Sequence, residues 1–141
     1  MVVVLGLSAL GCGDGGARTQ ARAFLTRFDA LDHREKPAAR EQQIAALEQL
    51  VVSEPEVVTA RRHCLEGHRA LLSSERAQEQ AAAALDRALA ASPGGAPLSG
   101  QASEQIRTEI EQAERSLARA RANLGQCENE ARGLRLRFGK P

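Results

Sequence analysis

Two cysteines, two histidines and a glutamate are the residues here that could do chemistry. Cys64 and His68 are four residues apart, so on a helix they share a face, as paired metal ligands do. If Cys127 lay opposite, with Glu130 one turn further, these four side chains could bind a soft or borderline divalent ion. His63 would point elsewhere. The alternative is a disulfide between Cys64 and Cys127, which is favoured because two Cys and one His form an incomplete zinc pattern.

A catalytic cysteine–histidine pair is the other chemistry that these residue types allow. It would need a third group to orient the histidine and a cleft for the substrate. A seam between two helices supplies neither. The glycine-rich segment 11–16 does not have the features of a phosphate loop, because no strand precedes it and no lysine follows at the required spacing. We therefore expect that the protein is not an enzyme and holds no cofactor.

Composition excludes further classes of function. The chain has 141 residues, which suits one domain, and it contains no Trp, no Tyr and three Phe. Lys and Arg number 19 against 18 Asp and Glu. Without a basic surface or aromatic platforms, we expect no binding to nucleic acid. No apolar run reaches the roughly 20 residues that span a bilayer.

The elements that must position the cysteines are helices. Stretches rich in Ala, Arg, Glu, Gln and Leu lie between the prolines and favour helix over strand. We expect helices at about 17–35, 38–52, 54–91 and 101–138. Ser53, followed three residues later by Glu56, has the spacing of a capping box at the start of the third helix. The segment 92–97 reads Ser-Pro-Gly-Gly-Ala-Pro and predicts a turn.

The two long helices carry matching apolar stripes with heptad spacing, which is typical of a coiled coil. Folding the chain back at the middle of the turn, between residues 95 and 96, places Cys64 opposite Cys127. The same register places Gly67 opposite Leu124 and Leu85 opposite Ile106. The stripe of the last helix consists of Ile106, Ile110, Ala113, Leu117, Ala120, Leu124, Cys127, Ala131, Leu134 and Phe138.

The sequence therefore predicts an all-α fold, built on a long antiparallel, coiled-coil-like helical hairpin. The shorter N-terminal helices carry apolar stripes of their own, such as Phe24 with Phe28 and Ile44 with Leu47. We expect these helices to pack on the hairpin as a small bundle. Residues 17–141 would form a single helical domain.

Residues 1–11 carry no charge and are followed by Cys12 and glycines. The run Ala9-Leu10-Gly11-Cys12 resembles the lipobox of bacterial lipoproteins. This resemblance implies that 1–11 is a leader, cut before Cys12, and that Cys12 receives a lipid, with 12–16 as lipidated residue and glycine-rich tether. It also implies a membrane-anchored protein of the cell envelope that faces the periplasm. Gly13, where an Asp would favour the inner membrane, favours the outer membrane.

A second resemblance concerns segment 81–93. Ala81, Leu85, Ala88 and Pro93 have the spacing of the second helix of a tetratricopeptide repeat. It implies a peptide- or protein-binding module and predicts a break in the helix near Ser73.

We expect a lipid-anchored structural or adaptor protein, whose partner is an unknown envelope protein or a second copy of itself. The alternatives are a periplasmic metal-binding or metal-sensing hairpin that uses the Cys64 set, and the repeat-type module.

Overall fold

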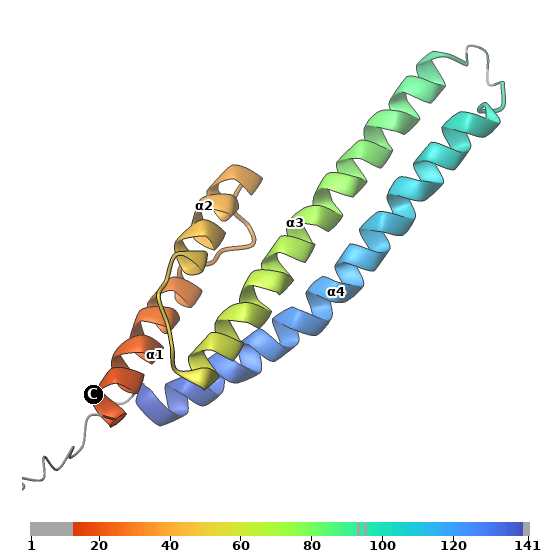
Figure 1. Cartoon of the computed structure of the whole chain (residues 1–141). Helices are drawn as coiled ribbons and strands as arrows, with labels where there is room; N and C mark the ends of the chain where they lie inside the picture. Colours follow the sequence, from red (N-terminus) through yellow and green to blue (C-terminus); the bar gives the residue numbers. More distant parts are fainter. Residues whose placement is uncertain (1–12, 93, 95, 140–141) are drawn as a thin grey trace, which may run out of the picture.

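The computed structural model describes residues 13–92, 94 and 96–139, and in these residues the chain is helical without any strand. Two long helices form an antiparallel hairpin, and two short helices pack on one side of it, at the end away from the turn (Figure 1). This is the predicted fold class. The described helices are α1 (Gly13–Asp29), α2 (Pro37–Glu48), α3 (Pro55–Ala90) and α4 (Gly100–Phe138).

Prolines and caps set most of the helix boundaries. Helices α2 and α3 begin at Pro37 and Pro55, since the fixed φ of proline suits the first helical position and its missing N–H is not needed there. Helix α4 begins after Ser99, whose hydroxyl accepts a hydrogen bond from the Ala102 amide at 3.2 Å. It ends at Phe138, the predicted end of the helix, and Gly139 is its C-cap.

The start of α3 differs from the sequence prediction. Glu54 is the N-cap, and no side chain of its own segment caps the helix. Instead, the Oε1 atom of Gln20 in α1 accepts hydrogen bonds from the Ser53 amide at 2.6 Å and the Glu54 amide at 3.0 Å. The predicted capping box at Ser53 is therefore wrong: Glu54 is the N-cap, and the Ser53 amide, which would donate to Glu56 in a capping box, donates to Gln20 instead.

The short helices also differ from their predicted ranges. Helix α1 includes residues 13–16, so the predicted tether forms its first turn. It ends six residues early, before a turn in which the Asp32 carboxylate accepts a hydrogen bond from the Arg34 amide at 2.9 Å. Helix α2 ends at Glu48, and Arg61 of α3 donates to the Leu50 carbonyl just beyond it. The leader 1–11 and Cys12 lie outside the described residues.

The hydrophobic core lies where α1 and α2 cover the hairpin. We call this part, residues 55–76 of α3 and 113–138 of α4, the covered half, and the remainder, 77–90 and 100–112, the stem. Both short helices contribute side chains with no solvent exposure, Phe24 from α1 and Leu47 from α2. The core comprises Ala21, Phe24, Leu25, Ile44, Leu47, Val57, Ala60, Cys64, Leu65, Leu72, Cys127, Ala131, Leu134 and Phe138.

Ion pairs fasten α2 along α3. The side chain of Arg40 is only 6% exposed, and its guanidinium donates hydrogen bonds to both carboxylate oxygens of Glu75, with Nη1 2.9 Å from Oε1. Arg69 contacts Glu48 at 2.5 Å, and Arg76 pairs with Glu41. Because two of these pairs lie near the start of α2 and one lies at its end, they fix the position of α2 along α3. Nothing in the local sequence pattern predicts them.

The stem is packed by small residues. Ala77, Ala81 and Ala84 of α3 are buried against α4, which lets the helices approach closely. The predicted seam is wrong at Leu85 and Ile110, which are 39% and 46% exposed. A seven-residue stripe drifts by about 20° per heptad on a straight α-helix, so these larger side chains have rotated out of the seam.

Candidate functional site

The covered half contains a buried disulfide. Cys64 and Cys127 are bonded, with Cα atoms 4.9 Å apart, and neither is exposed to solvent. The bond joins α3 to α4 in the predicted register. The two cysteines are 63 residues apart in the sequence, so the bond closes a long loop. In the chain-entropy model such a bond stabilises the fold by about 4 kcal/mol.

Gly67 lies one turn from the disulfide and has a packing role. A Cβ atom at Gly67 would lie 2.8 Å from Cγ and Cδ2 of Leu124 and 3.0 Å from its backbone nitrogen. No real Cβ tolerates such distances, so only glycine lets α3 and α4 come this close. The contact confirms the predicted pairing of Gly67 with Leu124.

Glu130 does not join His68 as the metal alternative requires. Its carboxylate instead binds His63, whose Nδ1 lies 2.9 Å from both oxygens. The two side chains are 16% and 29% exposed. His63, which the sequence analysis set aside, is therefore the residue that engages α4 on this side. Its i,i+67 contact has no local signal.

His68 lies on the other side of the hairpin, in a hollow of about 480 Å³ at the end of α1. Its pKa is lowered, chiefly because burial penalises the charged imidazolium, and further by the positive charges of Arg40 and His33. We call this the histidine hollow; its lining is Phe28, Asp29, Leu31, His33, His68, Leu71, Leu124, Cys127 and Glu128.

The predicted metal set is therefore divided between two sides of the hairpin, and its cysteines are joined. Within the part of the chain that the structure describes, no three side chains of His, Cys, Asp or Glu converge to hold a metal ion. The metal alternative, Cys64 with His68, Cys127 and Glu130, is not assembled here.

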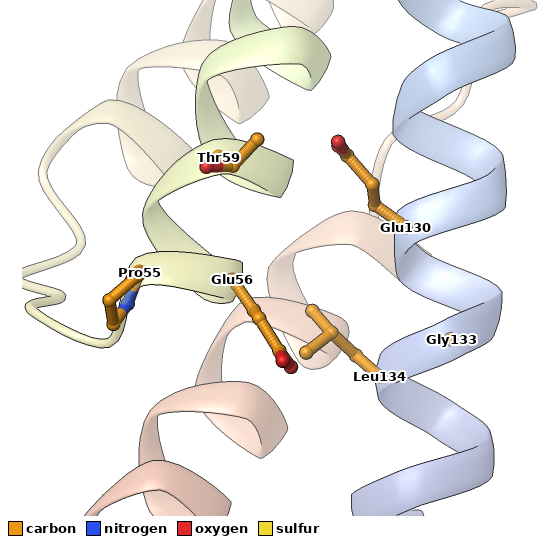
Figure 2. Close-up of a pocket in the computed structure, with 6 residues that line it drawn as sticks. All are labelled: Pro55, Glu56, Thr59, Glu130, Gly133 and Leu134. Carbon is orange, nitrogen blue, oxygen red and sulfur yellow. The ribbon is translucent and has the colours of Figure 1, made fainter.

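A second hollow lies between the start of α3 and the end of α4. Its volume is about 400 Å³, and its lining is Pro55, Glu56, Thr59, Glu130, Gly133 and Leu134. Figure 2 shows Thr59 of α3 and Glu130 of α4 on opposite sides of it, with a carbon of Thr59 toward the Glu130 carboxylate and the Thr59 oxygen turned away from it. Both carboxylates already have partners, since Glu56 binds Arg137 at 2.6 Å and Glu130 binds His63. The lining contains neither Cys nor Lys nor Ser, and the Thr59 hydroxyl has no base positioned to activate it.

Helix α3 runs through Ser73 and Ser74 without a break. The Ser74 hydroxyl, which is buried, donates to the Ala113 carbonyl of α4 at 2.9 Å. The break that a tetratricopeptide repeat needs at this point is absent, and the two helices form a hairpin instead. Among the described residues, no helix is both long and apolar enough to cross a membrane.

Comparison of the chain with models of protein families, with curated proteins and with solved structures found no match.

Proposed function

We propose that this chain is a lipid-anchored protein of a bacterial cell envelope, with a structural or adaptor role and no catalysis. The pairing of the cysteines is the observation that carries the proposal. Cys64 and Cys127 are bonded to each other, which leaves Cys12 as the third of three cysteines. Cys12 follows a charge-free apolar segment, as the acylated cysteine of a lipoprotein does. Disulfides persist in oxidising compartments such as the periplasm.

The geometry of the helices supports an adaptor role. Helix α1 starts at Gly13, directly after Cys12, at the end of the bundle that is far from the hairpin turn (Figure 1). Helix α3 has 36 residues, so it is about 54 Å long. A lipid on Cys12 would hold the covered half near the membrane, and the stem would project away from it. Such a projecting stem suits contact with another macromolecule.

In the two hollows, one cysteine sulfur and two carboxylates that a catalytic site could use are bound to other groups of the chain. A catalytic site needs a nucleophile or a general base within reach of a substrate. In the histidine hollow, the sulfur of Cys127 is bonded to the sulfur of Cys64. In the hollow of Figure 2, the carboxylates are engaged by Arg137 and His63.

Mass spectrometry of the protein extracted from its own membranes tests the proposal. We expect a chain that begins at Cys12, carries a lipid mass and lacks the two hydrogens that a disulfide removes. A Cys12→Ser variant should lose the lipid and leave the membrane fraction, and its soluble domain should keep the same circular dichroism. Density fractionation should place the native protein with the outer membrane.

Two results would contradict the proposal. A chain without lipid and with free thiols would overturn both the anchor and the oxidising compartment. A chain that carries a divalent ion would favour a metal-binding function, in which Cys64 and Cys127 are reduced.

A further inference from the structure

The histidine hollow has the size of a small-molecule site. Its volume is about 480 Å³, and such sites span roughly 300–1,000 Å³. Its lining comes from the end of α1, from the turn that follows, and from α3 and α4. Because these segments are far apart in the sequence, the hollow exists only once α1 has packed against the hairpin.

The wall of the hollow is largely apolar. Cys127 contributes a sulfur that is already bonded to Cys64, so the hollow offers a ligand no free thiol. The other apolar side chains are each only partly buried, which leaves surface that a ligand can cover: they are Phe28, Leu31, Leu71 and Leu124. An apolar group that moves from water into the hollow is therefore stabilised in proportion to the area that it buries.

Each long helix adds one polar side chain that is open to a ligand, His68 from α3 and Glu128 from α4. Within the residues that the structure describes, neither the imidazole nor the carboxylate has a hydrogen-bond or ion-pair partner. Burial lowers the pKa of His68, so at neutral pH its ring is uncharged and one ring nitrogen accepts a hydrogen bond. The Asp29 carboxylate, by contrast, is bound to Arg135. The acceptors that the hollow offers are therefore a neutral imidazole and an unpaired carboxylate.

We propose that the histidine hollow binds a small organic cation, an ammonium group carried on an apolar ring or chain, with the ammonium hydrogen-bonded to Glu128 and His68. The ammonium N–H groups supply the donors that these two acceptors lack, and the bond to the carboxylate is charge-assisted. A ligand with a carboxylate would instead be repelled by Glu128. This inference goes beyond the proposed adaptor role, and it depends neither on a lipid at Cys12 nor on a protein partner.

The charge of His68 should control this binding. An imidazolium ring has no free acceptor and repels an ammonium group, so the affinity should fall as the pH drops below about 6.5. The charged and titratable groups that face His68 come from every element around it: they are Asp29 of α1, His33 of the turn, Arg40 of α2 and Glu128 of α4. Of these, Asp29 and Arg40 are held in ion pairs, so His33 is the second histidine that the test has to separate from His68.

Titration with three probes that share a phenylethyl group tests the inference, on the full chain with Cys12→Ser so that no lipid is present. The probes are phenethylammonium, phenethyl alcohol and phenylpropionate. By calorimetry at about pH 7.5, we expect phenethylammonium to bind with a Kd below about 1 mM. The neutral alcohol should bind about tenfold more weakly, and phenylpropionate more weakly still. In NMR spectra, phenethylammonium should shift the ring signals of His68, which are assigned by their loss in His68→Gln.

Substitution of the carboxylate tests its role. Glu128→Gln should weaken the binding of phenethylammonium about tenfold and leave that of phenethyl alcohol unchanged. Glu128 is exposed, so the fold should be retained, which circular dichroism checks. The matched control is Glu114→Gln, because Glu114 is also an exposed glutamate of α4, two heptads earlier on the same side, but lies outside the hollow. It should leave the affinity unchanged.

The pH dependence tests the role of His68. Between about pH 7.5 and about pH 5.5 the affinity for phenethylammonium should fall. His68→Gln should remove most of this fall, since an amide still offers an acceptor but does not titrate. His33→Gln should remove less of it.

Four results would overturn the inference. The first is that phenethylammonium does not bind below about 10 mM, and the second is that phenylpropionate binds more tightly than it does. The third is an affinity that Glu128→Gln changes no more than Glu114→Gln does. The fourth is binding that leaves the His68 signals unmoved, because the probe would then occupy another site. None of these results would affect the lipid on Cys12, which mass spectrometry reports separately.

Discussion

The covered half and the stem are built from the same two helices but are held together differently. In the covered half, large side chains such as Phe24 and Leu47 are fully buried beneath α1 and α2, and a disulfide joins α3 to α4. In the stem, the buried side chains are those of three alanines, and Leu85 and Ile110 face outward. A pair of helices can bury only the narrow strip between them, whereas a third and fourth helix also bury the flanks.

This difference teaches where the stability of the protein lies. Burial of a large apolar side chain stabilises by about 1.5–3 kcal/mol, and most such burial is in the covered half. The stem is an extension that this half supports. Substitutions that disrupt the packing of the covered half should therefore destabilise the whole chain, whereas substitutions in the stem should cost little stability.

The largest effect is expected from removal of the disulfide. Cys64→Ala with Cys127→Ala should lower the free energy of unfolding by about 4 kcal/mol, because the unfolded chain regains the freedom of a long loop. Urea unfolding followed by circular dichroism measures this loss. The matched control is Cys12→Ser, which should leave the stability unchanged. A loss below about 1 kcal/mol would mean that the disulfide contributes little to the stability of the covered half.

Truncation of one large residue in each region compares the two directly. Phe24→Ala should cost about 3 kcal/mol, because it leaves a cavity in the core. Ile110→Ala should cost less than about 1 kcal/mol, since Ile110 is 46% exposed. Thermal unfolding of the two variants measures both losses of stability, so that they can be compared. Equal costs would contradict the division between covered half and stem.

Alanine at two glycines of α3 and α4 should act with opposite signs. Gly67→Ala should destabilise by about 2 kcal/mol, because its Cβ would overlap Leu124. Gly133→Ala should instead stabilise by up to about 1 kcal/mol, since no atom lies within 4 Å of the new Cβ and alanine favours helix. Urea midpoints measure both. If Gly67→Ala were stabilising, the close approach of the helices would be disproved.

The smallest expected effect is a pH dependence from His68. Because the pKa of His68 is lowered by burial, and then by Arg40 and His33, the unfolded chain binds its proton more readily than the folded chain does. The contribution of His68 is therefore fully present above the unfolded pKa of about 6.5 and is lost as the pH falls below it.

Urea unfolding at about pH 7.5 and about pH 5.5 measures the slope. His68→Gln should flatten it, and His33→Gln, which removes a lesser cause, should flatten it less. A slope that His68→Gln leaves unchanged would mean that other groups set the acid sensitivity.

Sequence reasoning was most successful where the chain determines structure locally. Helix propensity and the prolines predicted the helical elements, and α3 begins within one residue of its predicted start. The turn and the two cysteines together predicted the register of the covered half, which the Cys64–Cys127 bond and the Gly67–Leu124 contact confirm. Several independent patterns agreed on that register, which is why it was predictable.

Sequence reasoning failed where partners come from distant parts of the chain. The Ser53 amide donates to Gln20 of α1 rather than to Glu56, and Glu130 binds His63 rather than approaching His68. No local pattern signals such contacts, because the competing donors and acceptors are adjacent only after folding. The ion pair of Arg40 with Glu75 was missed for the same reason.

The sequence by itself thus determined that this protein is a helical hairpin, where it turns, and which cysteines meet. Only the tertiary structure decided which side chains are buried along that hairpin. The physical reason is the mismatch between a seven-residue stripe and the period of a straight helix, which accumulates with length. Near the disulfide the mismatch is small and the predicted seam holds. Along the stem it rotates Leu85 and Ile110 outward, so that they are 39% and 46% exposed.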